Sequence, residues 1–240
     1  MTGPVEVAAV VPAAGAGRRL GSQGAKALVR LGGRPLLAHV LACLEASRSV
    51  TAIVVMANPD AEEATAKVVA GEGLTKVASV LPGGPSRQAS VALGLAALPP
   101  GPWLVAVHDV VHPLAGPGLL DELVELLRAA GADGPAGVVP GAPVTDTVRR
   151  VGEGGRSLGV VHREQLRVIQ TPQLFVRSVL EEAHRRAARD GIEVADDAVL
   201  VEWAGHPVRV VPGPVENLKV TTALDLAMAE AILARRAASR

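Results

Sequence analysis

Aromatic and sulfur-containing residues are scarce in this 240-residue chain. It has no tyrosine, one phenylalanine, two tryptophans and one cysteine, Cys43. So few aromatic rings argue against a groove that stacks successive bases of a single nucleic-acid strand. A lone cysteine excludes an intrachain disulfide, which fits a reducing, cytoplasmic setting.

Excess charge and long apolar runs are also missing. Lys plus Arg and Asp plus Glu both number 24, and this balance argues against broad binding to nucleic acid or to a membrane surface. No uncharged apolar run reaches the roughly 18 residues of a membrane span. The N-terminal segment lacks the basic start of a signal peptide. Hydrophobic residues make up 49% of the chain, so a sizeable core is possible and one domain is favoured.

Valine-rich runs alternate with amphipathic segments, which predicts βαβ units. We expect an α/β fold with a mostly parallel sheet between helices, and ligands beyond the carboxyl ends of its strands. The expected strands are Val5–Pro12, Val50–Ala57, Val77–Leu81, Trp103–His108, Ala136–Pro140 and Pro207–Val211. The expected helices are Pro35–Ser47, Pro59–Ala70, Arg87–Leu98, Pro117–Ala130, Val176–Arg189 and Ala223–Arg235.

This alternation stops between residues 141 and 171, where short β-like pieces alternate with turns such as GEGG at 152–155. A long excursion inside a compact domain is usually functional or binds a partner. We therefore expect a single domain, residues 1–240, with residues 141–171 as a protruding β-arm.

The first strand ends in the loop PAAGAGRRL, residues 12–20, and Lys26 follows. The loop fits neither familiar phosphate motif. Leu20 stands where a dinucleotide fingerprint needs its third glycine, and neither Gly15 nor Gly17 precedes the Lys and Ser or Thr of a P-loop.

Small residues in this loop let backbone amides approach a ligand closely. Arg18, Arg19 and Lys26 add fixed cations, which suit the charge that grows when the α-phosphate of a nucleoside triphosphate is attacked. The alternative is an ordinary βα turn with a solvated basic edge.

The sequence PAAGAGRRL…K resembles the signature loop of the 2-C-methyl-D-erythritol 4-phosphate cytidylyltransferases, CTP-dependent enzymes of the non-mevalonate isoprenoid pathway. Further stretches fit that family in order: GGPSRQASV at 83–91, VHDVVHP at 107–113, PVTDT at 143–147, VHR at 161–163, QTPQLF at 170–175 and ENLKVTTALDLAMAE at 216–230. The resemblance covers nearly the whole chain. It implies a Rossmann-like nucleotidyltransferase fold, transfer of CMP from CTP with release of pyrophosphate, and a homodimer formed through the β-arm.

The resemblance also implies which residues contact the nucleotide. Arg19 and Lys26 would stabilise the transition state, and Asp109, at the end of a strand, would hold Mg²⁺ or another divalent cation. The expected nucleotide-binding residues are Ala13, Ala14, Gly15, Gly17, Gly84, Ser90 and Asp109. The other interpretation of 83–90 is a tight turn with Ser86 capping the next helix.

Four more residues are expected to position the acceptor polyol phosphate: Arg163 from the partner chain, Thr171, Lys219 and His112. A solvated surface charge is the alternative for Arg163 and Lys219. His112 stands where the family usually has arginine. We expect the phosphate to favour its imidazolium form, so that acceptor affinity depends on pH.

Two other functions remain open at this point. One is a cytidylyltransferase for another polyol phosphate, such as ribitol 5-phosphate. The other is a non-catalytic nucleotide-binding regulator. A transition-metal pair of His108 and His112 is disfavoured because no further His or Cys ligand is near in sequence. The adjacent carboxylates Asp196 and Asp197 do not form an acid–base pair on a helix, and Asp196 is expected to be an N-cap.

Overall fold

The structure is a computed structural model that describes residues 6–16, 24–131 and 133–239. Gly17, Arg18 and Arg19, for which the sequence predicts roles, lie outside these residues.

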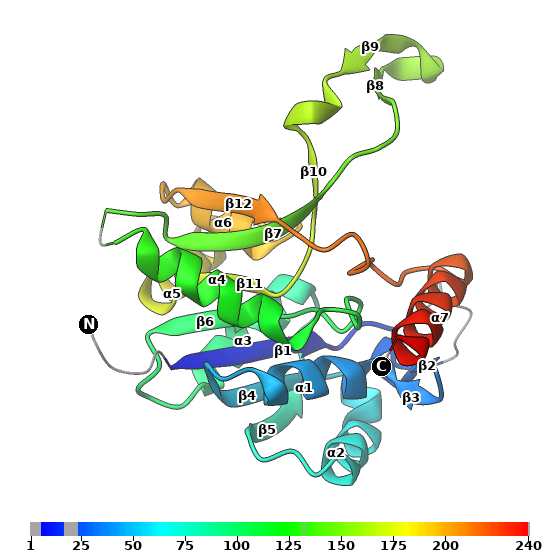
Figure 1. The fold of residues 1–240 in the computed structure, drawn as a ribbon. Coiled ribbons are helices and arrows are strands. Elements are labelled where there is room, and N and C mark those ends of the chain that lie inside the picture. Colours follow the sequence, from blue (N-terminus) through cyan, green and yellow to red (C-terminus); the bar gives the residue numbers. More distant parts are fainter. Residues whose placement is uncertain (1–5, 17–23, 132, 240) are drawn as a thin grey trace.

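An eight-stranded mixed sheet forms the centre of the molecule (Figure 1). Its order is β10-β7-β11-β6-β1-β4-β5, and β12 pairs with β7. The strands are β1 Val7–Ala13, β4 Val50–Ala57, β5 Val77–Pro82, β6 Leu104–Val107, β7 Gly137–Pro143, β10 Arg167–Ile169, β11 Gln173–Val176 and β12 Val208–Pro212. The strands β5, β4, β1 and β6 are parallel to one another, as the sequence predicted, and β12 is parallel to β7.

Helices cover both faces of this sheet because the central strands are apolar on both sides. In β1, Val7, Ala9 and Val11 pack with α1 (Leu36–Ala46) and α4 (Pro117–Ala129). Ala8 and Val10 pack on the other face, with α3 (Arg87–Ala97), α5 (Arg177–Asp190) and α6 (Asp197–Trp203). Such two-sided burial is typical of parallel sheets.

Two helices lie at the margins of this core. α2 (Glu62–Gly71) packs beside β5. α7 (Ala223–Ala238) covers the small hairpin of β2 (Arg30–Leu31) and β3 (Arg34–Pro35), as Figure 1 shows. Within the described ranges no helix is both long and apolar enough to cross a membrane.

Two helix caps that the sequence suggested are present: that of Asp196, which was expected, and that of Ser86, which belonged to the alternative interpretation of residues 83–90. The side chain of Ser86 accepts the backbone N–H of Ala89 at the start of α3. The side chain of Asp196 accepts the backbone N–H of Val199 at the start of α6.

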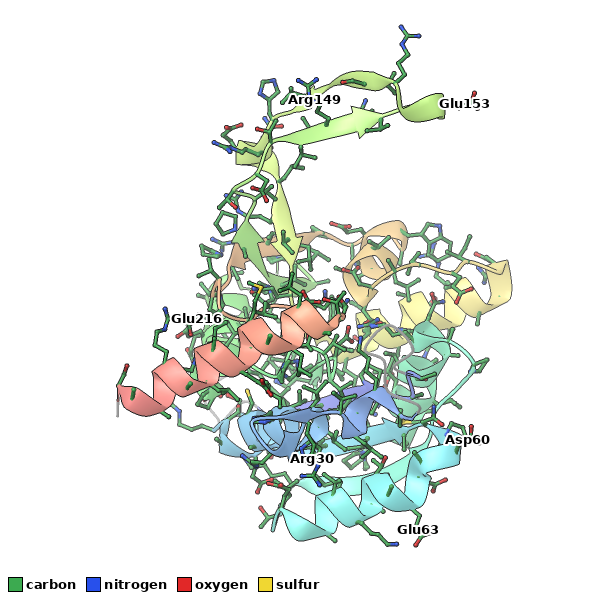
Figure 2. All side chains as sticks on the ribbon, turned by 90° about the vertical axis from the view of Figure 1, so that its right-hand side faces the viewer. Arg30, Asp60, Glu63, Arg149, Glu153 and Glu216 are labelled. Carbon is green, nitrogen blue, oxygen red and sulfur yellow. The ribbon has the colours of Figure 1, made fainter. Side chains whose placement is uncertain are left out.

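The predicted excursion contains a hairpin that projects away from the sheet (Figures 1 and 2). The hairpin pairs β8 (Val148–Val151) with β9 (Ser157–Val161). Both ends of the 141–171 segment belong to the main sheet, because β7 continues to Pro143 and β10 returns antiparallel to it. Val151, Leu158 and Val160 are more than half exposed on the hairpin.

β11 was not expected from the sequence. It continues the path of β10 along β7, and the register changes across residues 170–172. β11 lies antiparallel between β6 and β7, so this irregular segment is brought beside the end of β6. Strand irregularities of this kind redirect side chains next to sites.

Candidate functional site

A cavity of about 400 Å³ opens at the carboxyl ends of β1, β5 and β6. Its walls come from segments of the chain that are far apart in sequence. The lining residues are Pro12, Ala14, Gly15, Ala16, Lys26, Gly84, Pro85, Ser86, Arg87, Ser90, Asp109, Val110, Val111 and Lys219. This is the edge at which a parallel α/β sheet binds its ligands.

Hydrogen bonds hold the described part of the loop after β1. The backbone N–H of Lys26 donates to the carbonyl of Gly15 across 2.9 Å, which brings Lys26 back beside the small-residue segment. The side-chain amide of Asn58 donates to the carbonyl of Ala14 across 2.9 Å. Ala13 is fully buried at the end of β1, so Ala14 and Gly15 line the cavity and Ala13 supports them.

Close packing explains the glycines of the second loop. A Cβ atom on Gly83 would lie 2.6 Å from the Cβ of Ala14, and one on Gly84 would lie 2.7 Å from the Cβ of Ala89. The buried hydroxyl of Ser90 donates to the carbonyl of Ser86 across 2.9 Å and accepts the N–H of Gly84 across 3.1 Å. The hydroxyl proton of Ser90 is therefore donated within the protein. Ser90 shapes the loop that was expected to bind the cytosine base.

Asp109 follows β6 and is the carboxylate that lines the cavity among the described residues. Its Oδ1 accepts a 2.9 Å hydrogen bond from Nε of Arg87, and its Oδ2 lies 3.9 Å from Nζ of Lys219. Arg87 was not singled out from the sequence. With Lys26 and Lys219 it makes the described lining strongly cationic, which suits a phosphorylated ligand.

The loop bearing Lys219 is fixed to the core by buried amides. The Asn217 side chain donates to the carbonyl of Thr171 across 2.9 Å. The Gln170 side chain donates to the carbonyls of Pro214 and Asn217. The N–H of Val220 donates to the carbonyl of Val111 across 2.8 Å. These contacts place Lys219 opposite Asp109.

Thr171 lies beside the Asp109 loop and is outside the cavity lining. Its buried hydroxyl oxygen accepts the backbone N–H of Asp109 across 3.0 Å and lies 2.8 Å from Nδ1 of His108. The same oxygen is 2.9 Å from Nδ1 of His112. The Thr171 hydroxyl is thus engaged by the protein and holds the loop that carries Asp109.

The surroundings that the chain itself gives His112 favour a neutral imidazole, and the imidazolium expected with the acceptor phosphate stays a prediction. The His112 side chain is 2% exposed, and burial lowers its pKa to about 4, although Asp109 acts in the opposite direction. In these surroundings His112 is a neutral group that supports the cavity wall. His108 is fully buried, and burial lowers its pKa to about 3.

Arg163 is exposed at the base of the arm and is not part of the cavity lining. Its guanidinium donates to the carbonyl of Thr145 and lies 4.0 Å from Glu164. The described chain alone does not bring Arg163 together with Lys219.

The donor set fits a magnesium ion that is shared with a substrate. No cluster of three or more His, Cys, Asp or Glu side chains suited to a metal occurs among the residues described. Asp109 supplies one carboxylate, and Arg87 bonds only its Oδ1. Mg²⁺ is commonly held by one or two carboxylates together with substrate phosphates and waters.

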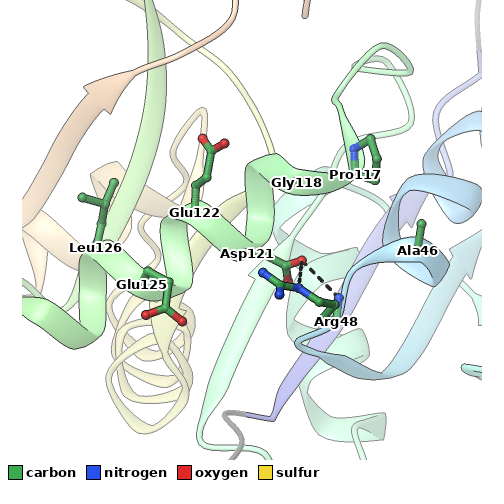
Figure 3. Close-up of a pocket in the computed structure, with 8 residues that line it drawn as sticks. All are labelled: Ala46, Arg48, Pro117, Gly118, Asp121, Glu122, Glu125 and Leu126. Atoms are coloured by element: carbon green, nitrogen blue, oxygen red, sulfur yellow. Dashed lines mark hydrogen bonds and ion pairs between the residues drawn. The ribbon is translucent and has the colours of Figure 1, made fainter. Parts of the chain in front are cut away.

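A second, larger depression lies between α1 and α4 (Figure 3). Asp121 there accepts the backbone N–H groups of Arg48 and Ser49 and the hydroxyl of Ser47. These bonds fasten the end of α1 to α4. Figure 3 shows Glu122 and Glu125 pointing away from this cluster. Arg48 is the cation among the described residues that line the depression, and no second one lies there. The packing of α1 against α4 accounts for the depression.

The chain resembles known proteins over nearly all of its length. A family model described as 2-C-methyl-D-erythritol 4-phosphate cytidylyltransferase matches residues 7–235. Proteins of that name from Pelotomaculum thermopropionicum and Streptomyces avermitilis are 43% and 44% identical; the alignments cover 96% and 95% of this chain, and 95% and 92% of theirs. A crystal structure of such a protein from Thermus thermophilus superposes with a TM-score of 0.77 at 38% identity, covering 95% of this chain and 98% of that one.

Proposed function

This chain belongs to the 2-C-methyl-D-erythritol 4-phosphate cytidylyltransferase family, and we propose that the cavity between Lys26 and Asp109 is its active site. The protein is a CTP-dependent nucleotidyltransferase of isoprenoid precursor biosynthesis. The observation that carries the site assignment is the convergence of Lys26, Asp109 and Lys219 in one cavity, although they are distant in sequence.

The reaction joins an anionic phosphate oxygen of the acceptor to the α-phosphorus of CTP. The bond from that phosphorus to the bridging oxygen breaks, and pyrophosphate leaves with the electron pair. The nucleophile is already ionised, so no general base is needed. Catalysis then depends on positioning and on stabilising the growing negative charge.

Each residue has a role in this scheme. Lys26, held beside Gly15, stabilises charge on the α-phosphate, together with Arg19. Gly84 and Ser90 shape the pocket for cytosine, and Ala14 and Gly15 expose backbone amides to the phosphates. Lys219 attracts the acceptor phosphate.

Asp109 would hold a divalent cation, for which Mg²⁺ is the best candidate because hard oxygen ligands suit it. The cation would neutralise triphosphate charge and orient the leaving group. Thr171 fixes the backbone of Asp109, so its contribution to the acceptor site is indirect.

We also propose that residues 1–240 act as one domain that dimerises through the arm. The exposed apolar residues Val151, Leu158 and Val160 on the hairpin support an interface there. Arg163 would then reach the acceptor phosphate in the partner's cavity. The cysteine, free and buried in the described chain, supports a cytoplasmic location.

The test is release of pyrophosphate by the full-length protein with CTP and Mg²⁺, using 2-C-methyl-D-erythritol 4-phosphate and ribitol 5-phosphate as separate acceptors. We expect turnover with the former to be clearly faster, and ATP to be a poor replacement for CTP. A Lys26→Ala variant serves as the background control.

Faster turnover with ribitol 5-phosphate would assign the chain to the other acceptor. Equal turnover with ATP would contradict the assignment of the base pocket. Absence of turnover with either acceptor would contradict the proposed reaction.

A further inference from the structure

A chain of buried and partly buried polar side chains runs from Asp109 into the interior. Nε of Arg87 donates to Oδ1 of Asp109 across 2.9 Å, and its Nη1 donates to Oδ2 of Asp197 across 2.8 Å. Oδ1 of Asp197 is 2.9 Å from Nε2 of His184. The four residues come from α3, the loop after β6, α6 and α5, and Arg87 joins two carboxylates that lie far apart in sequence.

Asp197 is a buried carboxylate, and keeping it ionised costs solvation free energy. Its side chain is 1% exposed. Burial alone would raise its pKa, yet the charge of Arg87 and the hydrogen bond from His184 keep that pKa below its usual value. A buried carboxylate is tolerated only when it is paired and hydrogen-bonded in this way.

The arrangement divides the Arg87 guanidinium between two anions. Arg87 donates to Oδ1 of Asp109. The other carboxylate oxygen, Oδ2, is not bonded by Arg87 and faces Lys219. Within the described chain, Nη2 of Arg87 has no hydrogen-bond partner. Arginine and carboxylate readily form a two-bond fork. A guanidinium with only Asp109 as counter-ion would turn its free Nη2 to the second oxygen.

The support around Asp197 is rigid. Gln88, next to Arg87, donates to the carbonyl of Ile192 across 2.9 Å and accepts the N–H of Val194 across 3.0 Å. α3 and the segment before α6 are thereby fixed to each other. The backbone that carries Arg87 is thus bonded to the segment that leads to Asp197.

We propose that Asp197 is a positioning residue that holds Arg87 in one-oxygen contact with Asp109 and so leaves Oδ2 of Asp109 open for a divalent cation. This inference rests on the proposed function of Asp109. It goes further in assigning a role to a side chain that does not line the cavity.

The test compares full-length wild type, Asp197→Asn and the double variant Arg87→Gln/Asp197→Asn. Mn²⁺ binding in the presence of CTP, without acceptor, is followed by electron paramagnetic resonance. Asparagine keeps the shape of Asp197 and an acceptor for Arg87 but removes the charge. We expect Asp197→Asn to weaken Mn²⁺ binding about tenfold, at the lower end of the effect of residues that orient metal ligands.

The double variant should bind Mn²⁺ at least as tightly as wild type, because no guanidinium then competes for Asp109. Glu181→Gln is the matched control, since Glu181 forms a 2.7 Å pair with Arg177 away from the active-site cavity. It should bind Mn²⁺ as wild type does.

Unchanged affinity in Asp197→Asn, or a double variant as weak as the single one, would overturn the inference. If Asp197→Asn does not fold, the double variant decides alone: wild-type affinity or better supports the inference, and weaker affinity refutes it. Failure of the proposed function would look different, because wild type itself would then bind no Mn²⁺ with CTP and release no pyrophosphate.

Discussion

The backbone N–H of Asp109 donates a 3.0 Å hydrogen bond to the side-chain oxygen of Thr171, 62 residues further along the chain. The N–H of Thr171 donates to Nδ1 of His112, so this nitrogen carries no proton. It therefore also accepts the Thr171 hydroxyl proton, and His108 must donate from its own Nδ1. The network fixes Nδ1 of His112 as an acceptor and Nδ1 of His108 as a donor, and it orients the loop of Asp109.

Removal of the Thr171 hydroxyl should disturb this loop. Thr171→Val leaves the buried N–H of Asp109 and the Nδ1–H donor of His108 unpaired, at about 1–3 kcal/mol for each group. We expect a lower free energy of unfolding in urea and a higher Mg²⁺ requirement for activity. Thr171→Ser keeps the hydroxyl and should remain close to wild type. Equal behaviour of the two variants would contradict the role of the hydroxyl.

Stability should fall below neutral pH because two histidines are buried uncharged. Their folded pKa values, about 3 for His108 and about 4 for His112, lie below the ordinary value of 6.5. The unfolded chain therefore binds more protons. The stabilisation is complete above pH 6.5 and is lost as pH falls toward 4, by up to about 1.4 kcal/mol per pH unit and histidine.

Urea unfolding between pH 7.5 and 5.5 measures this loss. His112→Asn, which cannot be protonated in this range, should show a shallower dependence than wild type. The same slope in both proteins would show that His112 does not contribute.

Lys26 should act mainly on the chemical step. In Lys26→Ala we expect kcat to fall roughly 10²–10³-fold, about 2.7–4 kcal/mol, by analogy with loss of one transition-state donor. The dissociation constant of CTP, measured without acceptor, should change much less. A change confined to CTP binding would mean that Lys26 stabilises only the ground state.

Sharing of Arg163 between chains is tested by mixing variants. Arg163→Ala and Lys26→Ala subunits, combined after verified exchange, should form heterodimers in which one site has both groups. Activity should rise to about one quarter of wild type, because half of the dimers are mixed and one of their two sites is intact. No recovery would show that Arg163 does not act across a dimer.

Gly83 tests the contact between the first two loops. Its added Cβ would lie 2.6 Å from that of Ala14, so Gly83→Ala must push the loops apart. We expect a raised KM for CTP with a smaller effect on kcat. Gly71→Ala, where the added Cβ meets no atom within 4 Å, is the control. A normal KM in Gly83→Ala would show that the loops can yield without loss of binding.

Local sequence patterns predicted many elements correctly. The apolar spacing on α1 and the caps of α3 and α6 depend on neighbouring residues, so they could be found in the sequence. β11 was missed because it is a four-residue strand whose position depends on pairing with β6 and β7. No signal within residues 173–176 distinguishes it from a connecting loop.

In the functional site, too, some residues could be found from the sequence and others could not. Lys26, Asp109 and Lys219 were found from motifs, and the structure brings them into one cavity. Arg87 and Asp197 were missed as functional residues because their pairing spans 110 positions. The low pKa that the chain gives His112 was not expected from the sequence, because burial depends on how distant segments pack.

The sequence by itself determined the alternation of strands and helices, the small-residue loop with its cations, and the family to which the chain belongs. These properties depend on short-range periodicity and on ordered motifs. Only the tertiary structure decided that Thr171 holds Asp109, that Arg87 is divided between two carboxylates, and that burial lowers the pKa of His112. Hydrogen bonds and desolvation act over a few ångströms in space, and the chain sets those distances only when its distant segments have packed together.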